Sequence, residues 1–226
     1  MARSRKFFFR NRPRRKPRRR RDPAVAREEL LDAAEQVFRE FHPDQVGLVD
    51  VAREAGVSHA LVTHYFGTYD GLVRATLERR VKALRARVLS RLRETGAVDR
   101  PRELLDLLFD ALDDPVHLRL LKWLVAGERV ADAQAFALGD HGLQTIAYEV
   151  AAELVGAPLS SKLVDTIELA LLVAVSAAFG YATSKYALAN ALGRSVSRDL
   201  DLEVRRTLAA MVQAHMRAEL AAATIR

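Results

Sequence analysis

The chain contains no cysteine among its 226 residues, so disulfide bonds and thiolate metal sites are excluded. Aromatic residues make up only 7% of it, and no segment alternates apolar and polar positions with the β-branched residues typical of strands. Neither a phosphate-binding loop nor a dinucleotide-binding glycine pattern occurs. These absences argue against a disulfide scaffold, a β-rich fold and a nucleotide-dependent enzyme. The lack of cysteine is compatible with a cytoplasmic protein.

Acidic residues are missing from the first 21 positions, which hold 12 lysines and arginines. Subtracting those 12 cations from the net charge of +7 leaves −5 for the rest of the chain. Such a basic run is typical of a disordered arm that meets a polyanion, either nucleic acid or an anionic membrane surface. Phe7, Phe8 and Phe9 do not make it a secretion signal, because Arg10 resumes the charge run before an apolar core can form.

The rest of the chain is rich in helix-forming residues, and its apolar residues recur at helical spacing. Asp22, Ser58 and Thr68 are expected to cap helices, and Gly56 is expected to end one in the left-handed conformation. We predict an all-α fold with a long helix carrying Leu72 to Leu92 and a looser piece at 132–138. The other helices should cover roughly residues 23–41, 48–55, 59–65, 104–112, 115–127, 141–155, 160–189 and 199–222.

Residues 51–66 form the pattern of a short helix, a glycine turn and a second short helix. Val51, Ala52 and Ala55 give the first helix an apolar face, and Ser58 can cap the second. This order is the signature of a helix-turn-helix, whose second helix lies in the DNA major groove. An ordinary helical hairpin has the same local pattern, so the flanking sequence decides between the two.

The sequence over residues 27–77 resembles the DNA-binding domain of the TetR (tetracycline repressor) family of bacterial regulators. The resemblance is carried by Leu30-Leu31-Asp32-Ala33-Ala34 with Val37-Phe38, Val51-Ala52, Ala55-Gly56-Val57-Ser58, His64-Tyr65-Phe66 and Leu72. It implies a helix-turn-helix domain at residues 22–70, preceded by the basic arm at 1–21. A larger helical ligand-binding and dimerisation domain would follow at 71–226, with the helix after Thr68 as the connector.

The chain departs from the family pattern at positions that members of the family use, in several cases, on DNA phosphates. The family usually has Gly, Thr, Gly, Tyr and Lys where this chain has His42, Gly47 with Leu48, Ala60, Thr63 and Tyr69. The general docking of the second helix in the groove therefore carries over better than any single contact.

We expect DNA contacts from the second helix of the motif, from residues beside it and from the end of the arm. Hydroxyl and imidazole groups there can hydrogen-bond phosphates or base edges, and Ala60 and Leu61 can touch thymine methyl groups, although Leu61 could equally pack inward. The expected set is Gly47, Leu48, Ser58, His59, Ala60, Leu61, Thr63, His64, Tyr65 and Tyr69, with Arg18, Arg19, Arg20 and Arg21 of the arm.

The run from Leu169 to Phe179 carries a single polar residue, Ser176. It is shorter than the roughly 20 residues that a bilayer span needs, so we expect no stable membrane association and predict a helix buried on every side. Such a helix cannot cover its own apolar surface. We therefore predict a homodimer in which the last two helices form a four-helix bundle, so that two recognition helices meet a palindromic operator.

The resemblance also implies an effector pocket among the helices of the second domain. Few charges occur in its apolar helices, so an apolar or weakly polar small molecule is expected. The candidate lining residues are the large side chains of this region, most of which could equally be core residues: Phe109, Trp123, Phe136, Tyr148, Phe179 and Tyr181.

No residues suggest catalysis, because no nucleophile lies near a plausible base and no paired carboxylates occur. His59 and His64 are five residues apart, which is not the spacing that places two metal ligands on one helix face. We therefore predict no enzyme activity, no metal and no cofactor. The predicted function is that of a ligand-responsive repressor that binds double-stranded DNA. Two alternatives stay open: a non-specific nucleic-acid-binding protein that uses the arm, and a helical protein associated with a membrane surface.

Removal of residues 1–21 is expected to weaken DNA binding, because lysines and arginines that neutralise phosphates release counterions. The salt dependence of the dissociation constant should become shallower at the same time. Anisotropy of a labelled duplex, titrated at several salt concentrations, measures both quantities. An unchanged salt slope would show that the arm does not touch DNA.

Overall fold

The computed structural model describes residues 22–95, 101–126, 142–155 and 161–224. All regular structure within these ranges is helical, which confirms the predicted fold class. The arm, Phe136 and the looser piece expected at 132–138 lie outside the described residues. The helices are α1 (Pro23–Glu40), the 3-10 helix η1 (Pro43–Gln45), α2 (Leu48–Ala55), α3 (His59–Phe66), α4 (Tyr69–Thr95), α5 (Pro101–Asp113), α6 (Pro115–Ala126), α7 (Gly142–Val155), α8 (Ser161–Ala191) and α9 (Arg198–Thr224).

The helix ends lie where short polar residues and glycine predicted them. The Asp22 carboxylate accepts a hydrogen bond from the Ala24 N–H at 3.0 Å, and Ser58 Oγ accepts one from the Leu61 N–H at 3.3 Å. Thr68 Oγ1 accepts from the Gly71 N–H at 3.0 Å. Gly56 has φ +65°, the left-handed conformation that ends α2. Local chemistry therefore sets these boundaries, as expected.

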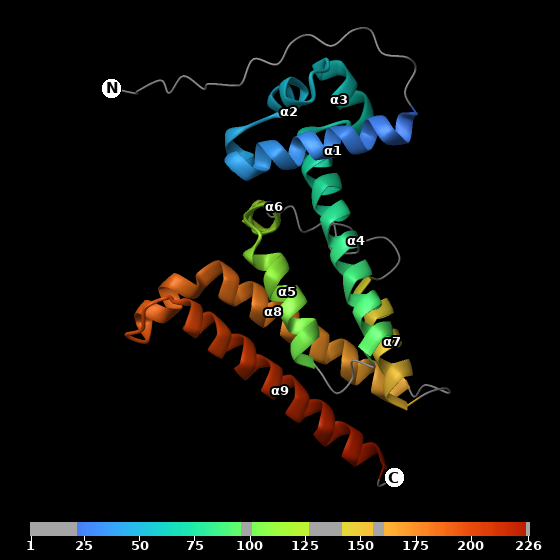
Figure 1. The fold of residues 1–226 in the computed structure, drawn as a ribbon, viewed down its shortest axis with the longest axis vertical. Coiled ribbons are helices and arrows are strands. Elements are labelled where there is room, and N and C mark those ends of the chain that lie inside the picture. The colour runs from blue at the N-terminus through green and yellow to red at the C-terminus, as the bar shows by residue number, and fades with distance from the viewer. Residues whose placement is uncertain (1–21, 96–100, 127–141, 156–160, 225–226) are drawn as a thin grey trace.

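Helices α1, α2 and α3 gather with η1 at one end of the molecule, and we call this group the head (Figure 1). The apolar face of α1 supplies Leu31 and Phe38, which have no exposed surface. Val51 of α2 and Val62 of α3 meet them, and each is likewise fully buried. Burial of apolar surface, worth about 25 cal/mol per Å², holds the three helices together. α2 and α3 have only eight residues each, and helices of that length are not stable alone.

Helix α6 shares the core of the head. Val116, Leu120 and Leu124 of α6 are at most 1% exposed and belong to the same apolar cluster as Phe38 and Leu72. α6 therefore packs against the head, although it follows the connector α4 and the helix α5 in the chain.

The remaining helices α5, α7, α8 and α9, which we call the body, lie on the other side of α6 from the head, with α7 against the far end of α4 (Figure 1). Val88 and Leu92 of α4 form a second apolar cluster with Ile146 of α7. α5 is tied to α9 by Arg205, whose guanidinium lies 2.8 Å from Asp110 and 2.5 Å from Asp113. α8 and α9 are the two longest helices of the body and pack against each other.

One side of α8 is exposed, which makes the prediction of a helix buried on every side wrong for the single chain. Ala170, Ala174 and Ala178 form its buried side, whereas Leu169 and Leu172 are 57% and 56% exposed. Val164 and Ile167 extend this buried side at the start of α8, and Leu169 and Leu172 lie outside it. By length and hydropathy, α8 is the one helix within the described ranges that could cross a membrane, a test that core helices also pass.

Replacement of Gly71 by alanine is expected to lower the free energy of unfolding by about 1–3 kcal/mol, because its Cβ would collide with the backbone carbonyl of Phe66 at the α3–α4 joint. Gly47→Ala is the matched control, since a Cβ there meets nothing within 4 Å and φ is −147°. The free energy of unfolding should fall less in Gly47→Ala than in Gly71→Ala. Urea unfolding followed by circular dichroism measures both, and equal losses would contradict the clash.

Candidate nucleic-acid interface

Backbone and side-chain hydrogen bonds hold α2 and α3 in a fixed relation. The Asp50 carboxylate accepts from the Gly47 N–H at 2.9 Å, which closes the start of α2. At the end of α2, the Val57 N–H donates to the Ala52 carbonyl at 2.9 Å, while Gly56 turns the chain. Ser58 then starts α3. A helix, a left-handed glycine and a capped second helix form the turn that the sequence predicted.

Helix α3 has one buried side and one exposed side. Val62 is fully buried, and the half-buried Leu61 and Tyr65 flank it. Ser58, His59, Ala60 and His64 are exposed. Positions 59, 60, 63 and 64 share one face at helical spacing, so this face is free to meet another molecule.

The Thr63 hydroxyl is already engaged within α3. It donates to the His59 carbonyl at 3.1 Å, a bond that helical threonines commonly make. Its oxygen can still accept a hydrogen bond, but its proton is in use. The structure therefore limits Thr63 to accepting from a base edge while this bond persists.

Arg27 of α1 is a neighbour of α3 that the sequence did not indicate. Its guanidinium lies 5.4 Å from the centre of the Phe66 ring, near the end of α3, and its side chain is 41% exposed. This cation–π contact joins residues 39 positions apart, so no local pattern predicts it. It adds a positive group beside the exposed face.

Tyr69 turns inward in the structure. Its hydroxyl donates to the Pro43 carbonyl at 2.6 Å, and its ring meets Phe38 and Trp123 edge-on at centroid distances of 6.5 Å and 6.1 Å. Burial, with Asp44, Asp50 and Asp70 nearby, raises the pKa of Tyr69. The hydroxyl stays protonated and donates within the protein, so in this arrangement that proton is not available to the phosphate we expected it to contact.

Residues 30–76 match the family described as bacterial regulatory proteins, tetR family. A curated relative, the HTH-type transcriptional regulator BetI of Cronobacter sakazakii, is 31% identical over 102 residues, which are 44% of this chain and 50% of BetI. Residues 30–76 therefore carry the DNA-binding region of the TetR family. The match with this chain covers about half of the length of BetI.

Solved structures of the TetR family share the fold beyond the head. A tetR-family transcriptional regulator from Streptomyces coelicolor has a TM-score of 0.63 at 22% identity, covering 86% of this chain and 84% of that protein. LfrR from Mycobacterium smegmatis, solved in complex with proflavine, has a TM-score of 0.50 at 20% identity, covering 85% and 96%. At these identities the likeness concerns the arrangement of the helices.

Four of the five described aromatic residues proposed for a TetR-type effector pocket belong to one apolar cluster that extends from the head into the body. Phe109 is buried and meets the Tyr181 ring at 6.4 Å, while Trp123 lies at the head, against Tyr69. Tyr148 is 48% exposed. Phe179 packs at the edge of the cluster that contains Phe109. Of the described candidates, Phe109, Phe179 and Tyr181 share the large apolar cluster with Trp123, and Tyr148 stands apart.

Within the described ranges, His59 and His64 do not belong to a group of side chains that could bind a metal ion. No group of three or more His, Cys, Asp or Glu side chains within the described ranges is placed to hold a metal ion. The two histidines lie on the exposed face of α3 of this TetR-family head, where His64 meets the Tyr65 ring edge-on at 5.4 Å.

Tyr69→Phe should lower the free energy of unfolding by about 1 kcal/mol, because it removes the hydrogen bond to Pro43 and keeps the ring. The salt slope of DNA binding should stay the same, since an inward hydroxyl neutralises no phosphate. Urea unfolding and anisotropy titrations at several salt concentrations measure the two effects. A change in DNA affinity without a change in stability would instead support the phosphate contact.

Proposed function

We propose that the chain is a sequence-specific DNA-binding transcriptional regulator that acts as a homodimer and represses its targets. The observation that carries this proposal is the exposed face of α3, held out by a left-handed glycine turn and a buried Val62. A helix presented in this way fits the major groove of B-DNA. Residues 22–70 would read DNA, and residues 71–226 would regulate and dimerise, with α4 as the connector.

The base edges would meet the side chains at the exposed start of α3. His59 and Ala60 are the foremost candidates there, and His64 lies on the same face one turn later. Ser58 and the half-buried Leu61, Thr63 and Tyr65 would contact the backbone or the groove wall, as would Gly47 and Leu48 at the start of α2. Arg18 to Arg21 would add phosphate contacts that raise affinity without reading sequence.

Self-association would cover the apolar surface of α8. Leu169, Leu172 and Val173 are each more than half exposed, and Met211 of α9 is 64% exposed. α8 and α9 pack against each other, so a second copy related by a two-fold axis would bury these side chains in a four-helix bundle. Two α3 helices would then meet half-sites about one helical turn apart, or more.

The effector would bind within the body. Phe109, Phe179 and Tyr181 supply apolar surface near the contact of α5 with α8, so an apolar or weakly polar molecule is the class that fits. A ligand that favours one spacing of the two heads over another would shift the population away from the DNA-binding form.

Ala60→Glu should abolish sequence-specific binding, since it places a carboxylate on the exposed face of α3, where phosphates and base edges would lie. Sequences enriched by the wild type from a random duplex pool supply the probe, and a scrambled duplex supplies the competitor. Wild type should bind the enriched duplex at least tenfold more tightly than the scrambled one, a difference of about 1.4 kcal/mol.

Ala86→Glu is the matched control, because Ala86 is exposed on α4 about two turns beyond Arg79, and the variant carries the same change of charge. It should bind nearly as well as wild type. Equal competition by native and scrambled duplexes would overturn sequence-specific regulation. Binding of the full chain to anionic vesicles, lost without residues 1–21, would favour the membrane-surface alternative.

A further inference from the structure

Helix α6 is fastened to the head by polar contacts as well as by its apolar core. Arg119 of α6 donates to the backbone carbonyls of Phe38 and Arg39, at 3.0 Å and 2.7 Å, and so binds the end of α1. Trp123 of α6 meets the Tyr69 ring, which in turn holds Pro43 of η1. α6 therefore contacts the segment that leads into α2.

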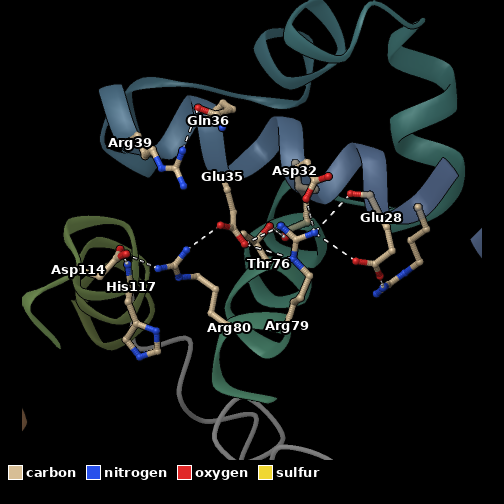
Figure 2. A network of polar contacts seen from close by, with 12 residues as sticks. Glu28, Asp32, Glu35, Gln36, Arg39, Thr76, Arg79, Arg80, Asp114 and His117 are labelled. Atoms are coloured by element: carbon tan, nitrogen blue, oxygen red, sulfur yellow. Dashed lines mark hydrogen bonds and ion pairs between the residues drawn. The ribbon is translucent and has the colours of Figure 1, made fainter. Parts of the chain in front are cut away.

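A third fastening runs through Arg80 of α4, which joins α1 to α6 (Figure 2). One guanidinium nitrogen lies 2.7 Å from Glu35 of α1, and the other lies 2.6 Å from Asp114 at the start of α6. The Arg80 side chain is only 16% exposed, and its Nε is buried without a hydrogen-bond partner. The planar guanidinium fork can hold two carboxylates from two helices at once, which a lysine ammonium cannot do in the same geometry.

Arg79, the neighbour of Arg80 on α4, binds α1 of the head. It pairs with Glu28, Asp32 and Glu35, which follow one another at helical spacing on α1. These carboxylates and Arg79 appear beside Arg80 in Figure 2. Arg79 therefore fixes α4 to α1, and Arg80 alone of the two extends the network to α6.

Asp114 has two tasks at the joint between α5 and α6. Its Oδ1 accepts from the N–H groups of Val116 and His117, at 2.9 Å and 3.1 Å, and so caps α6. Its Oδ2 holds Arg80. Partial burial opposes ionisation, but these N–H groups and Arg80 outweigh it and lower the pKa of Asp114. The carboxylate that starts α6 is thus also the one that attaches α6 to the connector and to α1.

The residue just before it, Asp113, is bound to the opposite part of the molecule. It pairs with Arg205 of α9 at 2.5 Å. Two successive carboxylates at the α5–α6 joint therefore hold the body on one side and the head on the other.

We propose that Asp114 is a positioning residue which, through Arg80 and Glu35, locks α6 to the head and fixes the head in its DNA-binding orientation. This proposal rests on the proposed function and assigns its regulation to one bridge of three side chains. Asp114 touches no DNA in this scheme. Its effect on DNA binding passes through the position of α6.

Asp114→Asn tests the bridge while keeping the cap, since an asparagine oxygen can still accept from Val116 and His117. It should weaken binding to the enriched duplex about fivefold to tenfold, at the low end of coupling between sites. The direction of this change in affinity is informative. Removal of a negative charge by itself would strengthen binding to DNA, which is a polyanion, whereas loss of the bridge should weaken it. Asp113→Asn makes the same charge change one residue away, but Arg205 keeps Asp110 as a partner, so α5 stays attached to α9. This variant should bind within about twofold of wild type.

A double-mutant cycle with Arg80→Lys shows whether the two residues act together. The lysine keeps the positive charge and loses the fork. If both act through one bridge, the double variant binds no more weakly than the weaker single variant, whereas independent effects would multiply. Trp123 is the sole tryptophan of the chain, so its fluorescence reports on α6, and its emission should shift to longer wavelength in Asp114→Asn.

The proposal is overturned by unchanged DNA binding in Asp114→Asn, by multiplying losses in the cycle, or by an unchanged Trp123 emission. A loss in Asp113→Asn as large as that in Asp114→Asn also overturns it, because a general effect of charge at the joint would then suffice. If the wild type enriches no sequence, the proposed function itself fails. If the wild type binds a specific sequence and the Asp114 and Arg80 variants bind it equally well, only the proposed bridge is contradicted, and the proposed function stands.

Discussion

The packing of α1 is the constraint on which the rest of the structure depends. One face buries Leu31 and Phe38 against α2, α3, α4 and α6, and the adjacent edge carries the carboxylates that hold Arg79 and Arg80. The apolar face forms the head, while the acidic edge connects the head to α4 and α6. Because both faces belong to one rigid helix, the orientation of the exposed face of α3 follows from where α1 sits on α4 and α6.

Much of the fold could be predicted because it is decided within a few residues. Asp22, Ser58 and Thr68 cap helices through their own side chains, and Gly56 adopts a conformation that few other residues tolerate. The bridge of Arg80 could not be predicted, since it joins positions 35, 80 and 114, and its geometry depends on how three helices cross. Sequence spacing shows which carboxylates share a face, but it does not show which distant cation they meet.

The expected site residues also fall into two groups: those whose placement local sequence predicts, and those whose placement depends on distant residues. The exposed face of α3 follows from local periodicity, so the placement of His59, Ala60 and His64 could be predicted. Tyr69 could not, because a tyrosine at the start of a helix fits a phosphate contact or a buried strut equally well, and only Pro43, Phe38 and Trp123 decide between them. Residue type alone likewise did not predict that Trp123 lies against the head while Phe109 and Tyr181 lie together in the body.

The exposed stripe of α8 and the anchored α6 constrain each other. A two-fold bundle that covers Leu169 and Leu172 would fix α8 and α9, and Arg205 would fix α5 with them. The head would then connect to this fixed body through α4, through the contact of α6 with α8, and through the α5–α6 joint, where Asp113 and Asp114 face opposite parts. The spacing of two heads on DNA would therefore depend on the geometry of that joint. A ligand that shifts α5 relative to α4 would act on it without touching the DNA-binding helices.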